Sequence, residues 1–289
     1  MTSSPSFHVE PLPATFGAVV TNIRLADLSE DAFRALYEDW LKYGLLIVRG
    51  QHLTWDEQIA FAKRFGPLEV EIGPLSNLLP DGSVRPSEGD DDDMIKVLKG
   101  NMTWHQDGTY MPVQAKGGML SAITIPSEGG ETGFADMEAA YDALDDEDRA
   151  LVEKLSAYHS LVRSQARLGH VQREGSAYPG YGMDVAEPPL RPMVKIHPET
   201  KRKSISIGRH AFSIPGMRDD EAEALLVRLR DQACQPPRVW HHRWTVGDIV
   251  IWDNRRIMHR ARPWDMREPR VMWHSRMAGN AMSESGISR

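Results

Sequence analysis

Apolar residues near the start of the chain recur with the spacing of an α-helix. Residues 29–43 predict a helix that Ser29 can cap, with one hydrophobic face formed by Phe33, Leu36, Tyr37, Trp40 and Leu41. A continuous apolar run over residues 45–48 predicts a short buried strand. A second helix is expected to begin at Thr54, because Thr54 and Glu57 have the spacing of a capping box.

From residue 94 onwards the pattern changes to short β-prone runs separated by turns. These runs cover residues 95–98, 120–125, 204–207, 248–252 and 271–275. Amphipathic helices are expected to interrupt them at about 137–155 and 219–233. Many short strands with few helices predict a mainly β fold, a sandwich or barrel with helices outside it. A Rossmann-like fold is disfavoured, because strands and helices do not alternate regularly and no GxGxxG follows a strand.

The segment 73–93 differs from its surroundings in its content of glycine, proline and acidic residues. This composition predicts a mobile loop, and one such loop in an otherwise ordered chain suggests a lid over a site. We find no internal repeat and no long Ser/Gly linker. The sequence therefore predicts a single domain over residues 1–289.

Composition excludes several classes of protein. The 289 residues carry 34 basic and 41 acidic side chains, and a net charge of −7 disfavours a general nucleic-acid binder. The longest apolar runs have the length of strands and are too short to span a membrane. The single cysteine, Cys234, excludes an internal disulfide and a cysteine-rich zinc site. With no recognisable secretory signal, a cytoplasmic protein is expected.

Histidine is the most informative residue type. An acidic residue follows two positions after His8, His105 and His197. His8 is expected in a frayed end of the chain, and His197 in a proline-containing turn that faces water. His105 ends a β-prone run, and in an extended segment His105 and Asp107 share one face.

A metal site needs a third ligand, for which His259, just after the β-prone run at 248–252, is the best candidate. Two histidines and one carboxylate form the ligand set of non-haem Fe(II) oxygenases. From these residues alone, an ordinary hydrogen-bonded strand end at His105 and Asp107 stays open as the alternative.

Several separated motifs resemble the taurine dioxygenase family. They are WHQDGTY (104–110), PSEGGETGFADMEAAYDAL (126–144) and GDIVIWDNRRIMHRA (247–261), followed by Pro269-Arg270. Their order and spacing match from about residue 10 to residue 278. The resemblance implies a double-stranded β-helix (jelly-roll) core, dependence on Fe(II) and 2-oxoglutarate, and iron ligands at His105, Asp107 and His259.

The resemblance assigns further positions. It places Thr132 against a carboxylate of 2-oxoglutarate, Arg270 against the distal carboxylate, and Asn101 near the substrate. Trp252 is expected to pack against the metal-bearing strand, with contact to 2-oxoglutarate as the alternative. Arginine suits this task because it binds carboxylates through two parallel hydrogen bonds.

One position departs from taurine dioxygenase. The second arginine of that enzyme is replaced here by His274, and Arg276 lies on the same strand face by the period of two. This difference argues against a sulfonate substrate.

The chain is more similar to aryloxyalkanoate dioxygenases that act on (S)-phenoxypropionates and 2,4-dichlorophenoxyacetate, herbicide-type compounds. Shared segments are DDMIKVLKGNMTWH, GSAYPGYGMD, YHSLVRSQARLGHVQ (158–172), IGRHAFSIPGM (207–217) and RVMWHSRMAG (270–279). The implied reaction uses dioxygen to hydroxylate the carbon next to the ether oxygen. It releases a phenol with pyruvate or glyoxylate, while 2-oxoglutarate becomes succinate and CO2. By the same resemblance the chain is expected to form a homo-oligomer.

A cationic group should hold the carboxylate of such a small anionic aromatic substrate. The first candidates are Arg209 and His210, then Lys96 and Lys99, of which at most one can point inward from a strand. Two alternatives stay open. One is the same chemistry on another small anion such as an alkyl sulfonate, and the other is an inactive barrel that binds a carboxylate.

Overall fold

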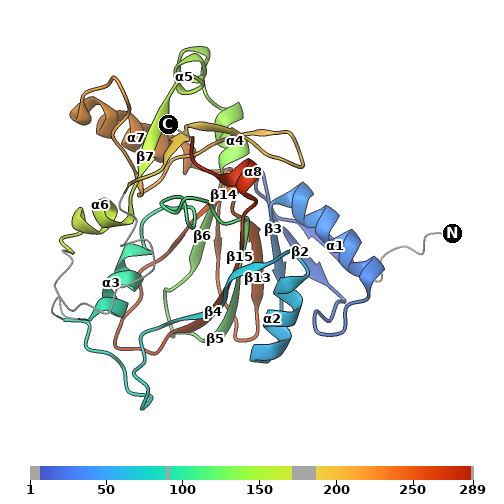
Figure 1. Cartoon of the computed structure of the whole chain (residues 1–289). Coiled ribbons are helices and arrows are strands. Elements are labelled where there is room, and N and C mark those ends of the chain that lie inside the picture. Colours follow the sequence, from blue (N-terminus) through green and yellow to red (C-terminus); the bar gives the residue numbers. More distant parts are fainter. Residues whose placement is uncertain (1–6, 89–91, 171–186, 288–289) are drawn as a thin grey trace.

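The computed structural model describes residues 7–88, 92–170 and 187–287. Two mainly antiparallel sheets face each other at its centre (Figure 1). The larger sheet has seven strands in the order β1-β2-β3-β13-β5-β15-β4. These strands are β1 His8–Pro11, β2 Ala18–Thr21, β3 Leu45–Val48, β4 Leu68–Ser76, β5 Gly117–Thr124, β13 Ile249–Asp253 and β15 Val271–Met277. The facing sheet has the order β12-β6-β14, with bounds β6 Thr132–Asp136, β12 Val239–His242 and β14 Ile257–Ala261. Only the β2–β3 pair of the larger sheet is parallel among the pairings of the described strands.

The central strands of the larger sheet are apolar on both faces. In β13, Val250 and Trp252 point between the two sheets, whereas Ile249 and Ile251 point to the helices outside. Both faces are therefore covered, which explains why β3 and β13 read as continuous hydrophobic runs without polar alternation.

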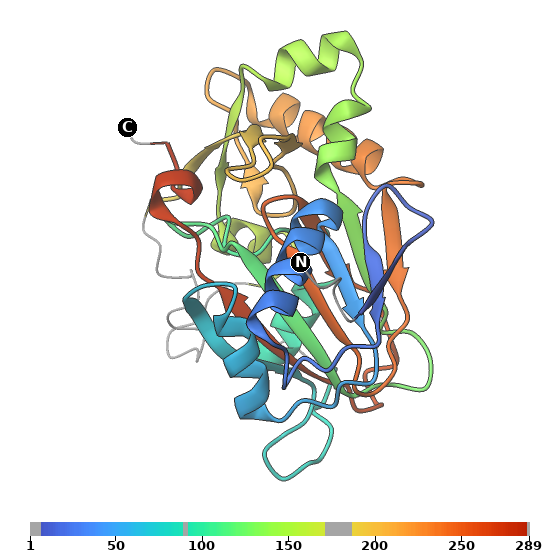
Figure 2. The same cartoon turned by 90° about the vertical axis from the view of Figure 1, so that its right-hand side faces the viewer.

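Helices α1 (Glu30–Tyr43) and α2 (Trp55–Lys63) cover the outer face of the larger sheet (Figure 2). Their starts confirm the prediction, since Ser29 accepts a hydrogen bond from the Ala32 N–H and Thr54 forms the capping box with Glu57. Gly44 ends α1 in the left-handed conformation, at φ 72°.

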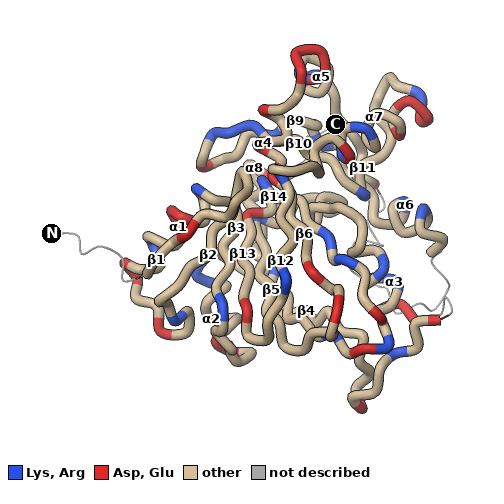
Figure 3. The backbone as a smooth tube through the Cα atoms, turned by 180° about the vertical axis from the view of Figure 1, so that it is seen from behind, with Lys and Arg blue, Asp and Glu red and all other residues tan. Residues whose placement is uncertain are grey.

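The helices α4 (Met137–Asp142), α5 (Asp146–Val152) and α7 (Asp219–Ala233) lie at one end of the molecule. Helix α7 has the predicted bounds. The single helix predicted over 137–155 is wrong, because Asp145 caps a new helix by accepting a 2.8 Å hydrogen bond from the Asp148 N–H. The acidic start of α5 projects from the fold (Figure 3).

Short elements complete the described fold. Two small sheets have the orders β11-β7-β8 and β10-β9. Their strands are β7 Ser156–His159, β8 Leu190–Pro192, β9 Val194–Ile196, β10 Lys203–Ile205 and β11 Ala211–Phe212. The remaining helices are α3 Asp93–Gly100, α6 Leu161–Ala166 and α8 Ala281–Glu284. Within the described residues, none of the helices has the length and apolarity needed to cross a membrane.

The region before the motif WHQDGTY (104–110) differs from the prediction in two ways. The strand predicted over residues 95–98 is wrong, because Asp92 caps helix α3 by accepting hydrogen bonds from the Met94 and Ile95 N–H groups. The loop predicted over 73–93 begins later, because residues 73–76 belong to β4 and pair with β15. The mobility of its remaining part stays a prediction.

Two histidines also lie in surroundings that differ from the prediction. His8 is part of β1 and pairs with Thr21, so it is not in a frayed end. His197 is buried, and its Nε2 lies 2.9 Å from Asp253 Oδ2. The turn at 197–200 therefore packs onto the end of β13 and does not direct this imidazole to water.

Candidate active site

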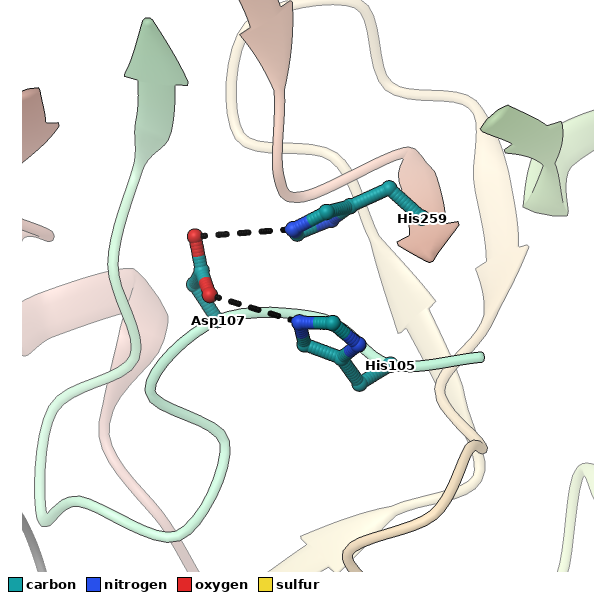
Figure 4. A group of neighbouring side chains, drawn as sticks. All are labelled: His105, Asp107 and His259. Atoms are coloured by element: carbon teal, nitrogen blue, oxygen red, sulfur yellow. Dashed lines mark ion pairs between the residues drawn. The ribbon is translucent and has the colours of Figure 1, made fainter. Parts of the chain in front are cut away.

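The side chains of His105, Asp107 and His259 point toward one another inside the barrel (Figure 4). One potential ligand atom of each residue lies within 4.8 Å of those of the other two. His105 Nε2 is 3.8 Å from Asp107 Oδ1, and His259 Nε2 is 3.9 Å from Asp107 Oδ2. The structure thus brings together the three residues that the sequence predicted as metal ligands.

Backbone pairing brings the two histidines together. The His105 N–H donates to the His259 carbonyl at 2.9 Å, and the His259 N–H donates to the His105 carbonyl at 2.8 Å. His259 lies in the middle of β14, so this isolated bridge adds residue 105 to the edge of the smaller sheet. Residue 105 forms this bridge and a turn covers residues 107–110, and the side chains of His105 and Asp107 both point toward His259 (Figure 4).

The electrostatics of the three groups suit a divalent cation. The His105 Nδ1–H donates to the Thr103 carbonyl at 2.8 Å, which leaves the Nε2 lone pair for a metal. Burial lowers the pKa of His105 and lowers the pKa of His259 to about 3, so both imidazoles are neutral. Burial alone would raise the pKa of Asp107, but His259, His274 and Arg276 hold it well below its usual range.

A third imidazole lies next to this group. His274 Nε2 on β15 is 3.4 Å from Asp107 Oδ2. The His274 ring stacks on Trp252, with centroids 5.6 Å apart and planes inclined by 14°. Trp252 is fully buried and also lies 4.7 Å from the His259 ring. Trp252 thus packs against the rings of His259 and His274, and it also lines the cavity described below.

The position of Trp252 depends on a glycine in the neighbouring strand. A Cβ atom on Gly118 of β5 would lie 2.2 Å from the Trp252 ring. We expect Gly118→Ala to push the indole against His259 and His274, lowering the stability by about 2 kcal/mol and reducing turnover. Urea unfolding and steady-state rates measure both effects. The control is Gly73→Ala on β4, whose Cβ would come no closer than 3.4 Å to other atoms; equal stability losses in the two variants would contradict this explanation.

Arg270 is a buried cation directed into the same cavity. Its Nε and Nη2 donate to the Gly130 carbonyl at 3.3 and 3.1 Å, and its guanidinium lies 5.0 Å from the Trp264 ring centroid. Burial lowers its pKa to about 10, which leaves it charged at neutral pH. Among the described residues no carboxylate pairs with it. A buried charge of this kind needs an anion, and a ligand carboxylate supplies one.

Thr132 lies at the start of β6 on the wall of this cavity. Its Oγ1 accepts a 3.0 Å hydrogen bond from Trp244 Nε1, which leaves the hydroxyl hydrogen for another acceptor. Thr132 and Arg270 together form a polar end of the cavity suited to a carboxylate.

One cavity of about 380 Å³ joins these groups. Its volume suits a small organic ligand. The three potential metal ligands, Thr132 and Arg270 all line it, as does Asn101. The rest of its wall is largely apolar and comes from β4, β5, α3, α6 and the segment before β15: Val70, Pro74, Leu75, Val97, Leu98, Leu120, Leu161 and Trp264.

Two of the cationic candidates lie on this wall. Arg209 is buried and hydrogen-bonds to Gln165 Oε1 and, at 3.4 Å, to Ser164 Oγ. His210 is buried beside it, with Nδ1 2.9 Å from Ser164 Oγ. Burial holds the pKa of His210 well below its usual range, so His210 is a neutral hydrogen-bonding group and Arg209 carries the charge.

The structure does not bring the other cationic candidates to the cavity. Lys96 and Lys99 lie in helix α3, so they share one helix face instead of facing opposite ways as predicted for a strand. Lys96 Nζ lies 3.7 Å from Asp93 Oδ1, and Lys99 Nζ donates to the Ser87 carbonyl at 3.2 Å. The helix face that lines the cavity carries Val97, Leu98 and Asn101.

Arg276 follows His274 on the same face of β15, as the period of two predicts. It is buried, and its Nε lies 3.0 Å from Glu69 Oε2. Arg276 does not line the cavity, but its positive charge helps to lower the pKa of Asp107.

Sequence reasoning missed Tyr110 as a wall residue. Tyr110 is buried, lines the cavity and contacts the His210 ring edge-on at 4.7 Å. Burial raises its pKa to about 12, so its hydroxyl stays protonated. Its place in the motif WHQDGTY, three residues after Asp107, was an available signal.

Known proteins are similar to this chain in sequence and in fold. The family model described as "Taurine catabolism dioxygenase TauD, TfdA family" matches residues 8–277. The (S)-phenoxypropionate/alpha-ketoglutarate-dioxygenase of Sphingobium herbicidovorans is 58% identical over 286 residues, covering 99% of each chain. The alpha-ketoglutarate-dependent 2,4-dichlorophenoxyacetate dioxygenase of Cupriavidus pinatubonensis is 35% identical over 284 residues, covering 92% of this chain and 96% of the relative.

A solved structure agrees with these relatives. The crystal structure of AAD-2 in complex with Mn(II) and N-oxalylglycine has a TM-score of 0.88 and 35% sequence identity to this chain. It covers 98% of this chain and 99% of its own. The predicted jelly-roll core and family resemblance are therefore confirmed. The match extends over almost the whole length, and the chain belongs to the TauD, TfdA family of dioxygenases.

Proposed function

We propose that this chain is an Fe(II)- and 2-oxoglutarate-dependent dioxygenase that oxidises aryloxyalkanoates at the carbon next to the ether oxygen. The observation that carries the proposal is the single cavity that contains the His105, Asp107 and His259 group, the buried cation Arg270 and a largely apolar wall. The names of two relatives, at 58% and 35% identity, support the substrate class.

The residues fit both cosubstrate and metal. His105, Asp107 and His259 offer two neutral nitrogens and one anionic oxygen, which leaves three positions of an octahedral Fe(II) for other ligands. Arg270 and Thr132 would hold the distal carboxylate of 2-oxoglutarate. Bound Fe(II) would couple the oxidation of 2-oxoglutarate by dioxygen, to succinate and CO2, to the insertion of one oxygen atom into a substrate C–H bond.

The substrate would be held by the wall that carries Arg209, His210 and Tyr110. Arg209 brings a positive charge to the cavity and His210 and Tyr110 bring hydrogen-bonding groups, so we place the substrate carboxylate there. The aromatic ring would lie on the apolar surface formed by Val97, Leu98 and the residues of β4. Such binding would keep water away from the reacting carbon and would fix the distance of that carbon from the metal ligands.

Hydroxylation of that carbon converts an aryloxypropionate into a hemiketal, which separates into a phenol and pyruvate. An aryloxyacetate gives a hemiacetal, which separates into a phenol and glyoxylate. In both cases one oxygen atom of dioxygen enters succinate and the other enters the substrate. A homo-oligomer and a cytoplasmic location stay predictions from the sequence.

Oxygen uptake by the purified protein with Fe(II) and 2-oxoglutarate tests the proposal. The substrates are both enantiomers of a phenoxypropionate, a phenoxyacetate and taurine, with phenol release followed in parallel. We expect uptake coupled one-to-one to phenol with at least one aryloxyalkanoate. Uptake with taurine alone would reject the substrate class, and no metal-dependent uptake with any compound would favour the inactive carboxylate-binding barrel.

A further inference from the structure

A fully buried asparagine holds the metal carboxylate through its backbone. Asn254 follows β13 directly, in the turn that leads to β14. Its Oδ1 accepts a 2.8 Å hydrogen bond from the Asp107 N–H, and its Nδ2 donates to the Asp107 carbonyl at 2.9 Å. The same Nδ2 donates to the Ala115 carbonyl at 2.9 Å. The side-chain amide thus pairs with Asp107 as the backbone of a neighbouring strand would.

This pairing attaches all three potential metal ligands to one connection, in which residues 254–256 lead from β13 of the larger sheet to β14 of the smaller sheet. His259 lies on β14, and His105 is bound to the His259 backbone by two hydrogen bonds. Asp107 is bound to the start of the connection through Asn254. The β13–β14 connection therefore sets the relative positions of the three residues.

The polar groups of Asn254 are all engaged within the protein. Its carbonyl accepts hydrogen bonds from Gln106 Nε2 at 2.9 Å and Gln114 Nε2 at 3.3 Å, and its N–H donates to the Lys116 carbonyl at 3.0 Å. Asn254 does not line the cavity. It has no role in contact with a ligand, so its effect on chemistry must pass through Asp107.

A second fully buried asparagine has the same relation to Arg270. Asn77 follows β4, and its Oδ1 accepts a 2.7 Å hydrogen bond from the Arg270 N–H. Its Nδ2 donates to the Met266 and Glu268 carbonyls at 2.9 and 2.8 Å, which fixes the segment leading to Arg270. The Asn77 N–H donates to the Arg270 carbonyl at 3.3 Å.

We propose that Asn254 and Asn77 are positioning residues with separate tasks. Asn254 sets the carboxylate of Asp107 for the metal, and Asn77 sets the guanidinium of Arg270 for the carboxylate of 2-oxoglutarate. The second half rests on the proposed function, whereas the first requires only that the three-residue group binds a divalent cation. Each residue acts through the backbone of the group it serves, so each should affect one binding step alone.

Asparagine is required at both positions by the mix of groups around it. Each side chain must accept one N–H and donate to two carbonyl oxygens at once. Serine is too short to bridge these partners. Aspartate has the right shape but places a negative oxygen against two carbonyls.

The test compares Asn254→Ser with Asn77→Ser in two binding measurements on the full chain. The first is binding of Mn(II) to the metal-free protein, followed by electron paramagnetic resonance. The second is binding of 2-oxoglutarate to the protein saturated with Mn(II), followed by calorimetry without oxygen. We expect Asn254→Ser to weaken Mn(II) binding by about 10- to 100-fold, the range for groups that support metal ligands. Asn77→Ser should keep the affinity for Mn(II) within about threefold of the wild-type value and should weaken 2-oxoglutarate binding by about tenfold.

Each variant is the matched control for the other, because both remove a fully buried asparagine with three side-chain hydrogen bonds. Thermal unfolding measures the stability that each loses. The proposal is overturned if both variants weaken the binding of Mn(II) and of 2-oxoglutarate equally, or if neither variant weakens the binding of either ligand. Both asparagines would then have a structural role only.

If Asn254→Ser does not fold, Asn254→Asp keeps the acceptor for the Asp107 N–H and tests the same prediction. Wild-type protein that binds Mn(II) but not 2-oxoglutarate would contradict the proposed function, while the Asn254 comparison would still decide the metal half.

Discussion

Replacing Asp107 by asparagine is expected to reduce turnover by more than about 1000-fold and to abolish tight binding of a divalent metal. The carboxylate is the only anionic group among the three potential ligands. An amide removes that charge and can offer only a neutral oxygen, while its N–H₂ group cannot coordinate a cation. Loss of a direct ligand should exceed the 10- to 100-fold loss that is typical of supporting groups.

The measurements for this variant are Mn(II) binding and phenol release under saturating Fe(II) and 2-oxoglutarate. Asp31→Asn is a suitable control, because Asp31 is exposed in the first turn of α1. It should retain the wild-type values. If Asp107→Asn keeps more than about a tenth of the wild-type turnover, this carboxylate is not a metal ligand.

Replacing Arg270 by glutamine should raise the KM for 2-oxoglutarate by about 100-fold or more. Removing one partner of a buried, hydrogen-bonded charge pair typically costs about 2–5 kcal/mol of binding, and about 1.4 kcal/mol corresponds to a factor of ten. Arg270→Lys keeps the charge but loses the two parallel hydrogen bonds, so an intermediate increase of about tenfold is expected. Mn(II) binding should be unchanged in both variants, because Arg270 is not one of the three ligand residues.

Stability separates this explanation from a merely structural role. The Arg270 guanidinium is buried and has no carboxylate partner among residues 7–88, 92–170 and 187–287. Removing an uncompensated buried charge should leave the ligand-free protein at least as stable as the wild type in urea. A large loss of stability together with an unchanged KM would show that Arg270 supports the fold and not the cosubstrate.

Periodicity and caps predicted the helices and strands whose residues signal their own boundaries. Ser29, Thr54 and the apolar run at 45–48 are examples, because local hydrogen bonds and burial on both faces determine these elements. The strand predicted at 95–98 failed because Ile95 and Val97 suit either element, and the cap at Asp92 decided for a helix. That choice also changed which side chains face the cavity and removed Lys96 and Lys99 from it.

The metal group was predictable because one motif carries two of its members and family spacing carries the third. The walls of the cavity were less accessible to sequence reasoning. Leu161 reaches the cavity through the packing of α6, which no local pattern specifies, and the motif WHQDGTY was the one signal that could have pointed to Tyr110. Asn254 and Asn77 gave no signal at all, since a buried asparagine is recognised only when its hydrogen-bond partners are known.

The attachment of the three potential metal ligands to the β13–β14 connection has a consequence for how the protein would acquire a metal during folding. The Asp107–Asn254 pair joins positions separated by 147 residues. Closing so long a segment costs chain entropy that local contacts cannot offset early, and folds rich in such distant contacts form slowly. A nascent or partly folded chain therefore offers a cation only His105 and Asp107, without His259 and without the fixed geometry that Asn254 gives to Asp107. Tight metal uptake would mark the completion of the barrel, and a chain arrested before that point would be left without its metal.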